Sequence, residues 1–194
     1  MSKILIIYAH PSRKEGNHAY FLEKVIEGLK TRHEDYELID LYALNYDPVL
    51  KNEELYSSGR KVISPENLAF QEKIKNSRCL IFIYPTWWSN LPAILKGWLD
   101  RVFTGGFGFT YKFGAPIGLL KGRKAAIFSA SGAPRWYSRW INFDRSLRIL
   151  SHDVLRFCGI KTKNFSLGSS RRINERVKDK IDKISEQALK YLLG

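Results

Sequence analysis

Short runs of apolar residues alternate with amphipathic segments along the whole chain. The runs at residues 4–8 and 80–84 are continuously apolar, which is typical of strands buried on both faces of a parallel sheet. Weaker apolar patterns predict further strands at residues 38–41, 125–128 and 162–167. Five such strands separated by helical segments indicate the α/β class.

Between these runs, apolar residues recur every three or four positions, as they do on the buried face of a helix. The repeats that predict helices comprise Phe21, Leu22, Val25, Ile26 and Leu29; Ile94, Leu95, Trp98, Leu99, Val102 and Phe103; Leu147, Leu150, Val154 and Phe157; and Ile173, Val177, Ile181, Ile184, Ala188 and Leu192. A fifth helix is expected to begin after Ser64, because serine followed by Pro65 is a typical helix start. Trp98 belongs to an apolar repeat and is therefore expected in the core.

Alternating strands and helices of this number predict a doubly wound parallel sheet with right-handed crossovers. Such sheets bind their ligands beyond the carboxyl ends of the strands, where the strand order reverses. The loops that follow the first, third and fourth predicted strands cover residues 10–17, 85–91 and 129–137. Functional residues are therefore expected in these loops.

The loop at residues 10–17 lacks both the G-x-G-x-x-G pattern and the P-loop pattern of nucleotide sites. It places a histidine, a serine, two cations and an amide directly before a helix, whose free N–H groups favour a phosphate. The alternative is an ordinary turn in which Asn17 caps the helix. The loop alone does not decide between a phosphate site and a capped turn.

Two adjacent tryptophans, Trp87 and Trp88, follow the third strand, and their neighbours cannot bury both indoles. A flat aromatic surface beside backbone N–H groups suits a planar heteroaromatic ligand such as an isoalloxazine ring. The next loop has small residues around Gly132, which allow the backbone to approach a ligand closely. Tyr137 follows them, and its phenol either donates a hydrogen bond to a ligand or packs among aromatic neighbours.

The most specific motif joins residues 84–88, Tyr-Pro-Thr-Trp-Trp, to residues 92–103, Pro-Ala-Ile-Leu-Lys-Gly-Trp-Leu-Asp-Arg-Val-Phe. Asp-Leu-Tyr at 40–42, Phe-Thr-Tyr at 109–111 and Phe-Cys-Gly at 157–159 support it. Together these motifs span most of the chain and resemble the flavodoxin-like NAD(P)H:quinone oxidoreductase family. That family includes quinone reductases, modulators of drug activity and potassium-efflux ancillary proteins.

The resemblance implies a flavodoxin-like doubly wound sheet of five parallel strands in the order 2-1-3-4-5, with helices on both faces. It also implies a homodimer with its two active sites at the subunit interface, a bound flavin (FAD or FMN), and NADH or NADPH as hydride donor. The residues that it assigns are His10, Ser12, Gly16 and Asn17 near the flavin phosphate, Pro85, Thr86, Trp87, Trp88, Ser131, Gly132 and Ala133 along the isoalloxazine, and Tyr137 as the catalytic residue beside the substrate.

Two positions depart from the family pattern. Phe143 stands where some members pair the tyrosine with a histidine, and Gly132-Ala133 replaces a Gly-Gly pair. The first departure removes an imidazole from the expected proton relay, because a phenyl ring neither donates nor carries a proton.

The identity of the flavin stays open between FAD and FMN. The spacing from His10 to Asn17 favours FAD slightly, whereas Arg172-Ile173 matches the arginine of FAD-binding members only loosely. The activity that the resemblance implies is a ping-pong transfer of two electrons from NAD(P)H to a quinone or similar acceptor.

The chain has 194 residues and no apolar run near the roughly 18 residues of a membrane span, so we expect a single domain over 1–194 and no membrane insertion. The first apolar run is too short for a signal peptide, which predicts a cytoplasmic protein. The two cysteines, Cys79 and Cys158, lie far apart and outside any metal-ligand spacing. We therefore expect reduced core thiols and no metal site.

The net charge of +13 raises the local concentration of polyanions around the protein. The 32 Lys and Arg residues are scattered, so a solvated basic surface is favoured over a nucleic-acid groove. Two rivals to the enzyme remain as hypotheses. One is a flavin-binding regulatory or ancillary subunit of a membrane transporter with little turnover of its own, and the other is a basic nucleic-acid-binding domain.

Overall fold

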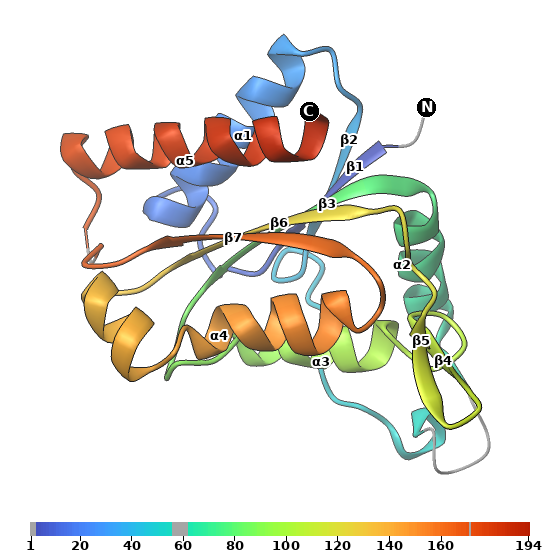
Figure 1. Cartoon of the computed structure of the whole chain (residues 1–194). Coiled ribbons are helices and arrows are strands. Elements are labelled where there is room, and N and C mark those ends of the chain that lie inside the picture. The colour runs from blue at the N-terminus through green and yellow to red at the C-terminus, as the bar shows by residue number, and fades with distance from the viewer. Residues whose placement is uncertain (1–2, 56–61, 171) are drawn as a thin grey trace.

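A parallel sheet of five strands forms the centre of the molecule in the computed structural model, which describes residues 3–55, 62–170 and 172–194 (Figure 1). The strands lie in the order β2-β1-β3-β6-β7 and pair in parallel throughout. Their bounds are β1 Lys3–Tyr8, β2 Tyr36–Asp40, β3 Ser77–Pro85, β6 Lys124–Ala130 and β7 Lys161–Leu167. Numbered within this sheet alone, the order is 2-1-3-4-5, and the predicted flavodoxin-like α/β fold is confirmed.

The hairpin of β4 (Phe109–Lys112) and β5 (Ala115–Gly118) is not predicted by the apolar pattern. Its side chains are exposed or half-buried, so the sequence has no buried apolar run there. Phe113 and Gly114 form its turn with φ angles of 53° and 79°, a left-handed geometry that matches the twist of antiparallel strands. The hairpin lies at the opposite end of the molecule from the carboxyl ends of the parallel strands (Figure 1).

Helices cover both faces of the sheet (Figure 1). Helices α1 (Asn17–Thr31) and α5 (Glu175–Leu193) lie on one face, and α2 (Pro65–Lys75), α3 (Ala93–Val102) and α4 (Arg145–Arg148) lie on the other. The other helical segments are η1 (Asn52–Glu54), η3 (Tyr137–Ile141) and η4 (Ile149–Arg156), of which η3 and η4 have the wide turns of π-helices. α4 and η4 together form the helix predicted from the apolar repeat at residues 147–157.

Two helix starts test the predicted boundaries. The Ser64 hydroxyl accepts a hydrogen bond from the Asn67 N–H at 3.3 Å, so the predicted start of α2 is confirmed. The inclusion of Ile173 in the last helix is wrong, because Asn174 caps α5 by accepting a hydrogen bond from the Val177 N–H at 3.0 Å.

The sheet divides the apolar core into two clusters. The cluster under α1 and α5 contains Cys79, and the cluster on the other face contains Trp98 and Cys158. Trp98 is fully buried, and both cysteines are buried free thiols, as predicted. Burial raises the pKa of the Cys158 thiol to about 12 and also raises that of Cys79.

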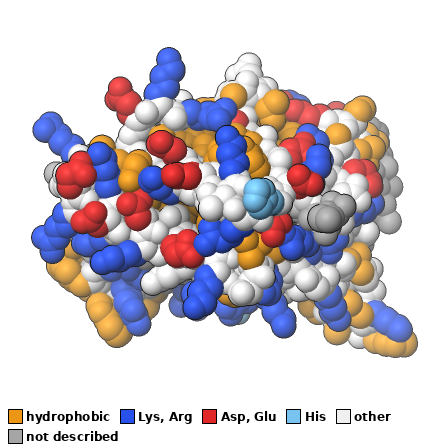
Figure 2. Space-filling model, turned by 90° about the horizontal axis from the view of Figure 1, so that it is seen from above, with side chains coloured by type: hydrophobic (Ala, Val, Ile, Leu, Met, Phe, Trp, Pro, Cys, Tyr) orange, Lys and Arg blue, Asp and Glu red, His pale blue; other side chains and the backbone are white. Residues whose placement is uncertain are grey.

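Positive charge is dispersed on the face shown in Figure 2, where Lys and Arg side chains lie among Asp and Glu side chains. Arg32, which caps the end of α1, pairs with Glu186 of α5 at 2.6 Å, and Lys178 pairs with Glu175 within α5 at 2.8 Å. Among the described residues, no helix combines the length and apolarity needed to cross a bilayer.

Candidate functional site

The carboxyl ends of β1, β3 and β6 bring the three predicted loops to one end of the sheet (Figure 1). Backbone hydrogen bonds continue from the strands into the loops. The Ala9 N–H donates to the Ile83 carbonyl at 2.9 Å, and the Thr86 N–H donates to the Ala130 carbonyl at 3.0 Å. The first residues of the three loops therefore lie side by side, where the strand order reverses between β1 and β3.

The loop after β1 folds back on itself. The Ser12 N–H donates to Nδ1 of His10 at 3.0 Å, and the buried Tyr8 hydroxyl donates to the Ser12 carbonyl at 2.6 Å. α1 follows directly, and its N-cap is Gly16, with a φ of 91°. Asn17 is the first helical residue, so the alternative in which Asn17 caps the helix is wrong.

The start of α1 has the properties of an anion site. Within the described part of the chain, no side chain caps this helix and its first turn holds no acidic residue. Asn17 is buried and its Nδ2 donates to the Ser170 carbonyl at 2.6 Å, while its Oδ1 has no hydrogen-bond partner among the described residues. A helix N-terminus with free N–H groups favours a phosphate, and an unpaired buried oxygen favours a ligand that donates a hydrogen bond.

A groove of about 880 Å³ extends from this helix start along α1 toward the beginning of α5. It is lined by residues 12–17, by Tyr20, Glu23 and Ile26 of α1, and by Arg172 and Ile173. Arg13 and Lys14 add positive charge beside Arg172, although the Arg13 guanidinium also pairs with Asp40 at 3.3 Å.

The turn after β3 holds both tryptophans out of the core. Trp87 and Asn90 exchange two backbone hydrogen bonds, of 3.2 and 2.9 Å. The residues between them, Trp88 and Ser89, have φ angles of 50° and 58°, in the left-handed region that bulky residues rarely adopt. Trp88 is fully exposed and Trp87 is 43% exposed, so the prediction that the neighbours cannot bury both indoles is confirmed.

The loop after β6 packs tightly on the end of β7. The Ser131 N–H donates to the Leu167 carbonyl at 2.9 Å, so it is not free for a ligand. A Cβ on Gly168 would lie 2.6 Å from the backbone nitrogen of Arg135, which shows that only glycine permits this approach. The backbone N–H groups of Gly132 and Ala133 have no partner in the described residues and remain available as donors.

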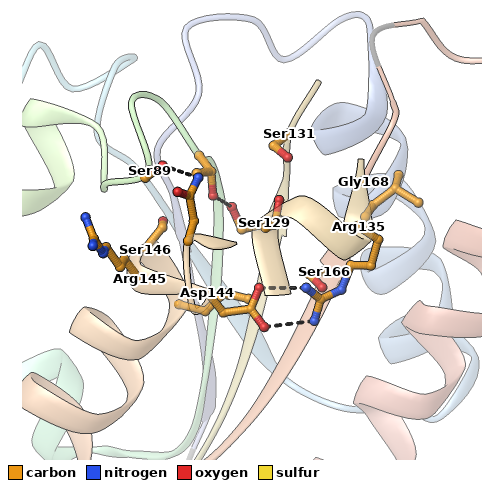
Figure 3. Close-up of a pocket in the computed structure, with 14 residues that line it drawn as sticks. Ser89, Ser129, Ser131, Arg135, Asp144, Arg145, Ser146, Ser166 and Gly168 are labelled. Carbon is orange, nitrogen blue, oxygen red and sulfur yellow. Dashed lines mark hydrogen bonds and ion pairs between the residues drawn. The ribbon is translucent and has the colours of Figure 1, made fainter. Parts of the chain in front are cut away.

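Long-range contacts fix the segment after this loop (Figure 3). The Arg135 guanidinium binds both oxygens of Asp144, at 2.6 and 2.9 Å. The Asn142 amide donates to the Ser89 hydroxyl at 2.7 Å and so joins this segment to the tryptophan turn. A cavity of about 30 Å³ lies between them, and serine side chains such as Ser129 and Ser146 are among the residues that line it (Figure 3).

Tyr137 and Phe143 lie on the exposed side of this segment. Tyr137 begins η3, is 38% exposed and packs edge-on against Trp136 with ring centroids 5.9 Å apart. Phe143 is 58% exposed and has a φ of 51°. Neither ring is part of the hydrophobic core. Tyr137 does pack against an aromatic neighbour, as one of the two alternatives predicts, but part of its side chain stays open to a ligand.

His18 is a polar residue of the site that the sequence analysis missed. Its ring stacks on His10 with centroids 4.7 Å apart, and its Nε2 accepts a hydrogen bond from the Ala130 N–H at 3.3 Å. Burial, and then the neighbouring charge of His10, lower the pKa of His18 to about 3, so it is neutral. The sequence does contain a signal for this burial, because His18 lies three and four positions before Phe21 and Leu22, on the same buried face of α1.

Comparison with known proteins identifies relatives over the whole chain. A family model described as the flavodoxin-like fold matches residues 2–192. An uncharacterized NAD(P)H oxidoreductase of Haemophilus influenzae is 28% identical over 185 residues, which cover 94% of this chain and 92% of that protein. A ribosyldihydronicotinamide dehydrogenase [quinone] of Rattus norvegicus is 31% identical over 180 residues, covering 82% of this chain and 78% of its own length.

A solved structure agrees with these relatives. The NAD(P)H:quinone oxidoreductase from Methanothermobacter marburgensis superimposes with a TM-score of 0.83 at 27% identity, covering 96% of this chain and 95% of its own. The motifs at residues 84–103, the strand order and these relatives agree with one another. The chain therefore belongs to the flavodoxin-like NAD(P)H:quinone oxidoreductase family.

Proposed function

We propose that this protein is a flavin-dependent NAD(P)H:quinone oxidoreductase that transfers two electrons in a ping-pong cycle. The observation that carries the proposal is the turn after β3, which holds an exposed indole in a left-handed conformation at the same end of the sheet as the free N–H groups of the β6 loop. Strained backbone that exposes an aromatic ring marks a binding site. The names of the Haemophilus and rat relatives support NAD(P)H as donor and a quinone as acceptor.

The loop after β1 is proposed to hold the flavin phosphate. The uncapped start of α1 supplies N–H donors to the phosphate, and Gly16 gives the backbone its left-handed entry into the helix. The unpaired Oδ1 of Asn17 accepts a hydrogen bond from a ligand hydroxyl. His10 and Ser12 fix the shape of the loop through their mutual hydrogen bond.

The other two loops are proposed to hold the isoalloxazine. Trp88 supplies a flat surface, and it follows Trp87 and Pro85, the buried last residue of β3, along the chain. Thr86 is tied to the β6 loop through the 2.7 Å contact between its hydroxyl and that of Ser129. Beside Ser131, the free N–H groups of Gly132 and Ala133 are the donors for ring carbonyls.

Bound flavin supplies the redox chemistry, by accepting a hydride from NAD(P)H and passing it to the acceptor. Tyr137 is proposed as the catalytic residue, because its side chain is only partly buried and its hydroxyl can donate a hydrogen bond where negative charge develops. Phe143, which is 58% exposed in the same segment, has no proton to give. The donor and the acceptor are proposed to use the same place in turn.

FAD is proposed rather than FMN. The groove of about 880 Å³ beyond the phosphate loop has room for a second phosphate and a nucleoside, and Arg13, Lys14 and Arg172 supply cations for it. Mass analysis of the flavin released from the purified protein decides between the two. Release of FMN alone overturns this choice.

The protein is proposed to be a cytoplasmic homodimer. Leu44, Val49 and Leu50, between β2 and η1, and Leu68 of α2 are exposed aliphatic side chains, which a second copy would cover. Two buried free thiols suit a reducing compartment. Sedimentation velocity measures the oligomeric state directly, and a monomer at micromolar concentration contradicts the dimer.

The decisive experiment measures the colour of the purified protein and its turnover with NADH or NADPH and menadione. We expect a yellow protein and parallel double-reciprocal lines. A colourless protein that takes up neither flavin overturns the proposal. A flavoprotein with almost no turnover supports the ancillary-subunit alternative, and intersecting lines contradict the shared site.

A further inference from the structure

The Asp-Leu-Tyr motif at residues 40–42 ends β2 beside the loop that follows β1 (Figure 1). Asp40 is the last residue of β2 and pairs in register with Tyr8, the last residue of β1. The Asp40 side chain is buried. Its Oδ1 accepts hydrogen bonds from the N–H groups of Tyr42 and Ala43, both at 3.1 Å, and so closes the turn after the strand. These two bonds use one of the two carboxylate oxygens.

The other carboxylate oxygen, Oδ2, faces a cation of the loop after β1. Oδ2 is buried and has no hydrogen-bond partner in the part of the chain that the structure describes. The Nε of Arg13 lies 3.3 Å from it and forms an ion pair with it. Burial of a carboxylate is unfavourable, and a neutral asparagine closes such a turn as well as aspartate does. The charge of Asp40 therefore points to a role beyond the turn, and that role involves Arg13.

The Arg13 guanidinium has donors that the ion pair leaves free. Its Nε faces Asp40, and among residues 3–55, 62–170 and 172–194 no acceptor binds its Nη1 or Nη2. The side chain is 48% exposed and lines the groove that extends from the start of α1. A guanidinium binds phosphate oxygens through paired N–H groups, and this geometry requires a defined orientation. The free edge of Arg13 is thus available to an anion in the groove.

Tyr8 holds the residue that precedes Arg13. Its buried hydroxyl donates to the Ser12 carbonyl at 2.6 Å. Burial, and then the negative charge of Asp40, raise the pKa of Tyr8, so the hydroxyl stays protonated and keeps this hydrogen bond. The paired ends of β1 and β2 therefore hold both the backbone of Ser12 and the side chain of Arg13.

We propose that Asp40 is a positioning residue, which orients the Arg13 guanidinium so that its Nη groups bind a phosphate of the flavin. The inference rests on the proposed function, which brings a flavin phosphate to the start of α1. An arginine that rotates freely loses side-chain entropy when it binds a phosphate, and the ion pair with Asp40 imposes part of this order in advance. Repulsion between Asp40 and the phosphate opposes this effect. It is weakened because Arg13 and two backbone N–H groups already compensate the carboxylate.

The test compares the affinities of FAD, FMN and riboflavin, which share the isoalloxazine and differ in their phosphates. Each is titrated into the full chain, stripped of flavin, and binding is measured by quenching of flavin fluorescence. Asp40→Asn removes the charge and keeps the oxygen that closes the turn, and Asp40→Ser repeats the change with a second turn-closing side chain. Arg13→Gln is made alone and together with Asp40→Asn. The matched control is Glu37→Gln, which removes a carboxylate from the same strand, where it pairs with Lys73 at 2.8 Å.

Arg13→Gln should lower the affinity for FAD about tenfold or more, because charge-assisted hydrogen bonds to a phosphate are lost. Asp40→Asn and Asp40→Ser should each lower it about fivefold, and Asp40→Asn should have no further effect beside Arg13→Gln. Riboflavin affinity should stay unchanged in every variant, and Glu37→Gln should bind all three flavins like the unaltered protein. A loss with FAD alone assigns Arg13 to the second phosphate, and an equal loss with FMN assigns it to the phosphate that both carry. Either result supports the proposal.

Other outcomes overturn it. Tighter binding of FAD by Asp40→Asn would show that repulsion outweighs positioning. An equal loss of riboflavin affinity would assign Asp40 a purely structural role, and a full effect of Asp40→Asn beside Arg13→Gln would show that Asp40 does not act through Arg13. Unchanged FAD affinity in the Asp40 variants overturns this inference and leaves the proposed function standing. A protein that binds none of the three flavins overturns both.

Discussion

Trp88 has a left-handed φ of 50° and a fully exposed indole. The indole therefore adds no packing to the flavin-free protein, and its removal can be used to test flavin binding alone. A left-handed conformation costs an L-residue roughly 1–2 kcal/mol, and glycine avoids this strain at some entropic cost. Trp88→Gly should therefore leave the stability of the flavin-free protein unchanged or raise it by up to about 1 kcal/mol in urea unfolding. Flavin affinity should fall by about tenfold or more, because the stacking surface is lost.

Phe113→Gly is the control for Trp88→Gly. Phe113 has a φ of 53° and is 97% exposed, but it lies on the distant hairpin. It should show the same effect on stability and no effect on flavin titration. Unchanged flavin affinity in Trp88→Gly would show that this indole does not contact the flavin.

Tyr137 and Phe143 lead to a pH prediction. No imidazole occupies the segment from Ser131 to Phe143, and the neutral His18 does not titrate near pH 6.5, since its pKa is about 3. The rate of flavin reduction by NAD(P)H should therefore show no inflection near pH 6.5 in stopped-flow measurements. Tyr137→Phe should slow it about tenfold or more through loss of a donor. An inflection near neutrality that persists in Tyr137→Phe would assign proton transfer to another histidine.

His18 also links stability to pH. Its folded-state pKa of about 3 lies below the unfolded value of 6.5, so the unfolded chain binds more protons between these values. Stability should be constant with respect to this group above about pH 7 and should fall below pH 6.5, by up to about 1.4 kcal/mol per pH unit. His18→Gln should remove this slope in urea unfolding, whereas His152→Gln, at an exposed site, should keep it. Identical slopes in all three proteins would show that His18 is not the group responsible.

At the scale of elements, burial explains which predictions succeed. β1 and β3 are predicted within a few residues because they are buried on both faces and leave continuous apolar runs. The β4–β5 hairpin is missed because its side chains are exposed. The π-helical turns of η3 and η4 have no periodic signature that distinguishes them from ordinary helix.

The candidate site also has parts that the sequence predicts and parts that it does not. Its loops are predictable, because a parallel sheet places ligands at the carboxyl ends of its strands. The contacts that shape the loops are not, because they join residues far apart in sequence. Asn142–Ser89 spans 53 positions and Asn17–Ser170 spans 153. No local pattern marks such pairs.

Gly168 tests how closely β7 supports the β6 loop. An added Cβ would lie 2.6 and 2.8 Å from backbone atoms of Arg135, so the loop must move. Gly168→Ala should lower the free energy of unfolding by roughly 1–3 kcal/mol and also weaken flavin binding. Gly122→Ala is the matched control: its φ of 86° makes alanine strained, but its Cβ would meet open space. That variant should lose stability with unchanged flavin affinity, and equal flavin affinity in Gly168→Ala would show that the loop does not depend on this approach.

In the molecule as a whole, the two faces of the one parallel sheet pack against two separate hydrophobic clusters. Successive residues of β3 point to opposite faces: Cys79 and Ile81 belong to the cluster under α1 and α5, whereas Leu80 and Phe82 belong to the other. If the helices on one face of the sheet detach, the strands lose the packing on that face. The helices on the other face pack against the same strands, so their packing is weakened too. The whole chain should therefore unfold as a single cooperative unit, as expected for one domain over residues 1–194.

The two buried thiols report on this cooperativity, since Cys79 lies in one cluster and Cys158 in the other. Burial raises both pKa values, and only the thiolate reacts, so labelling requires opening of the protein. In the single-thiol variants Cys79→Ala and Cys158→Ala, a thiol reagent should label the remaining cysteine slowly, with the same dependence on urea as global unfolding. Faster labelling of Cys79 with a weak urea dependence would instead reveal local opening of α5, whose Leu192 carbonyl accepts the Cys79 S–H hydrogen bond at 3.5 Å, and would contradict a single cooperative unit.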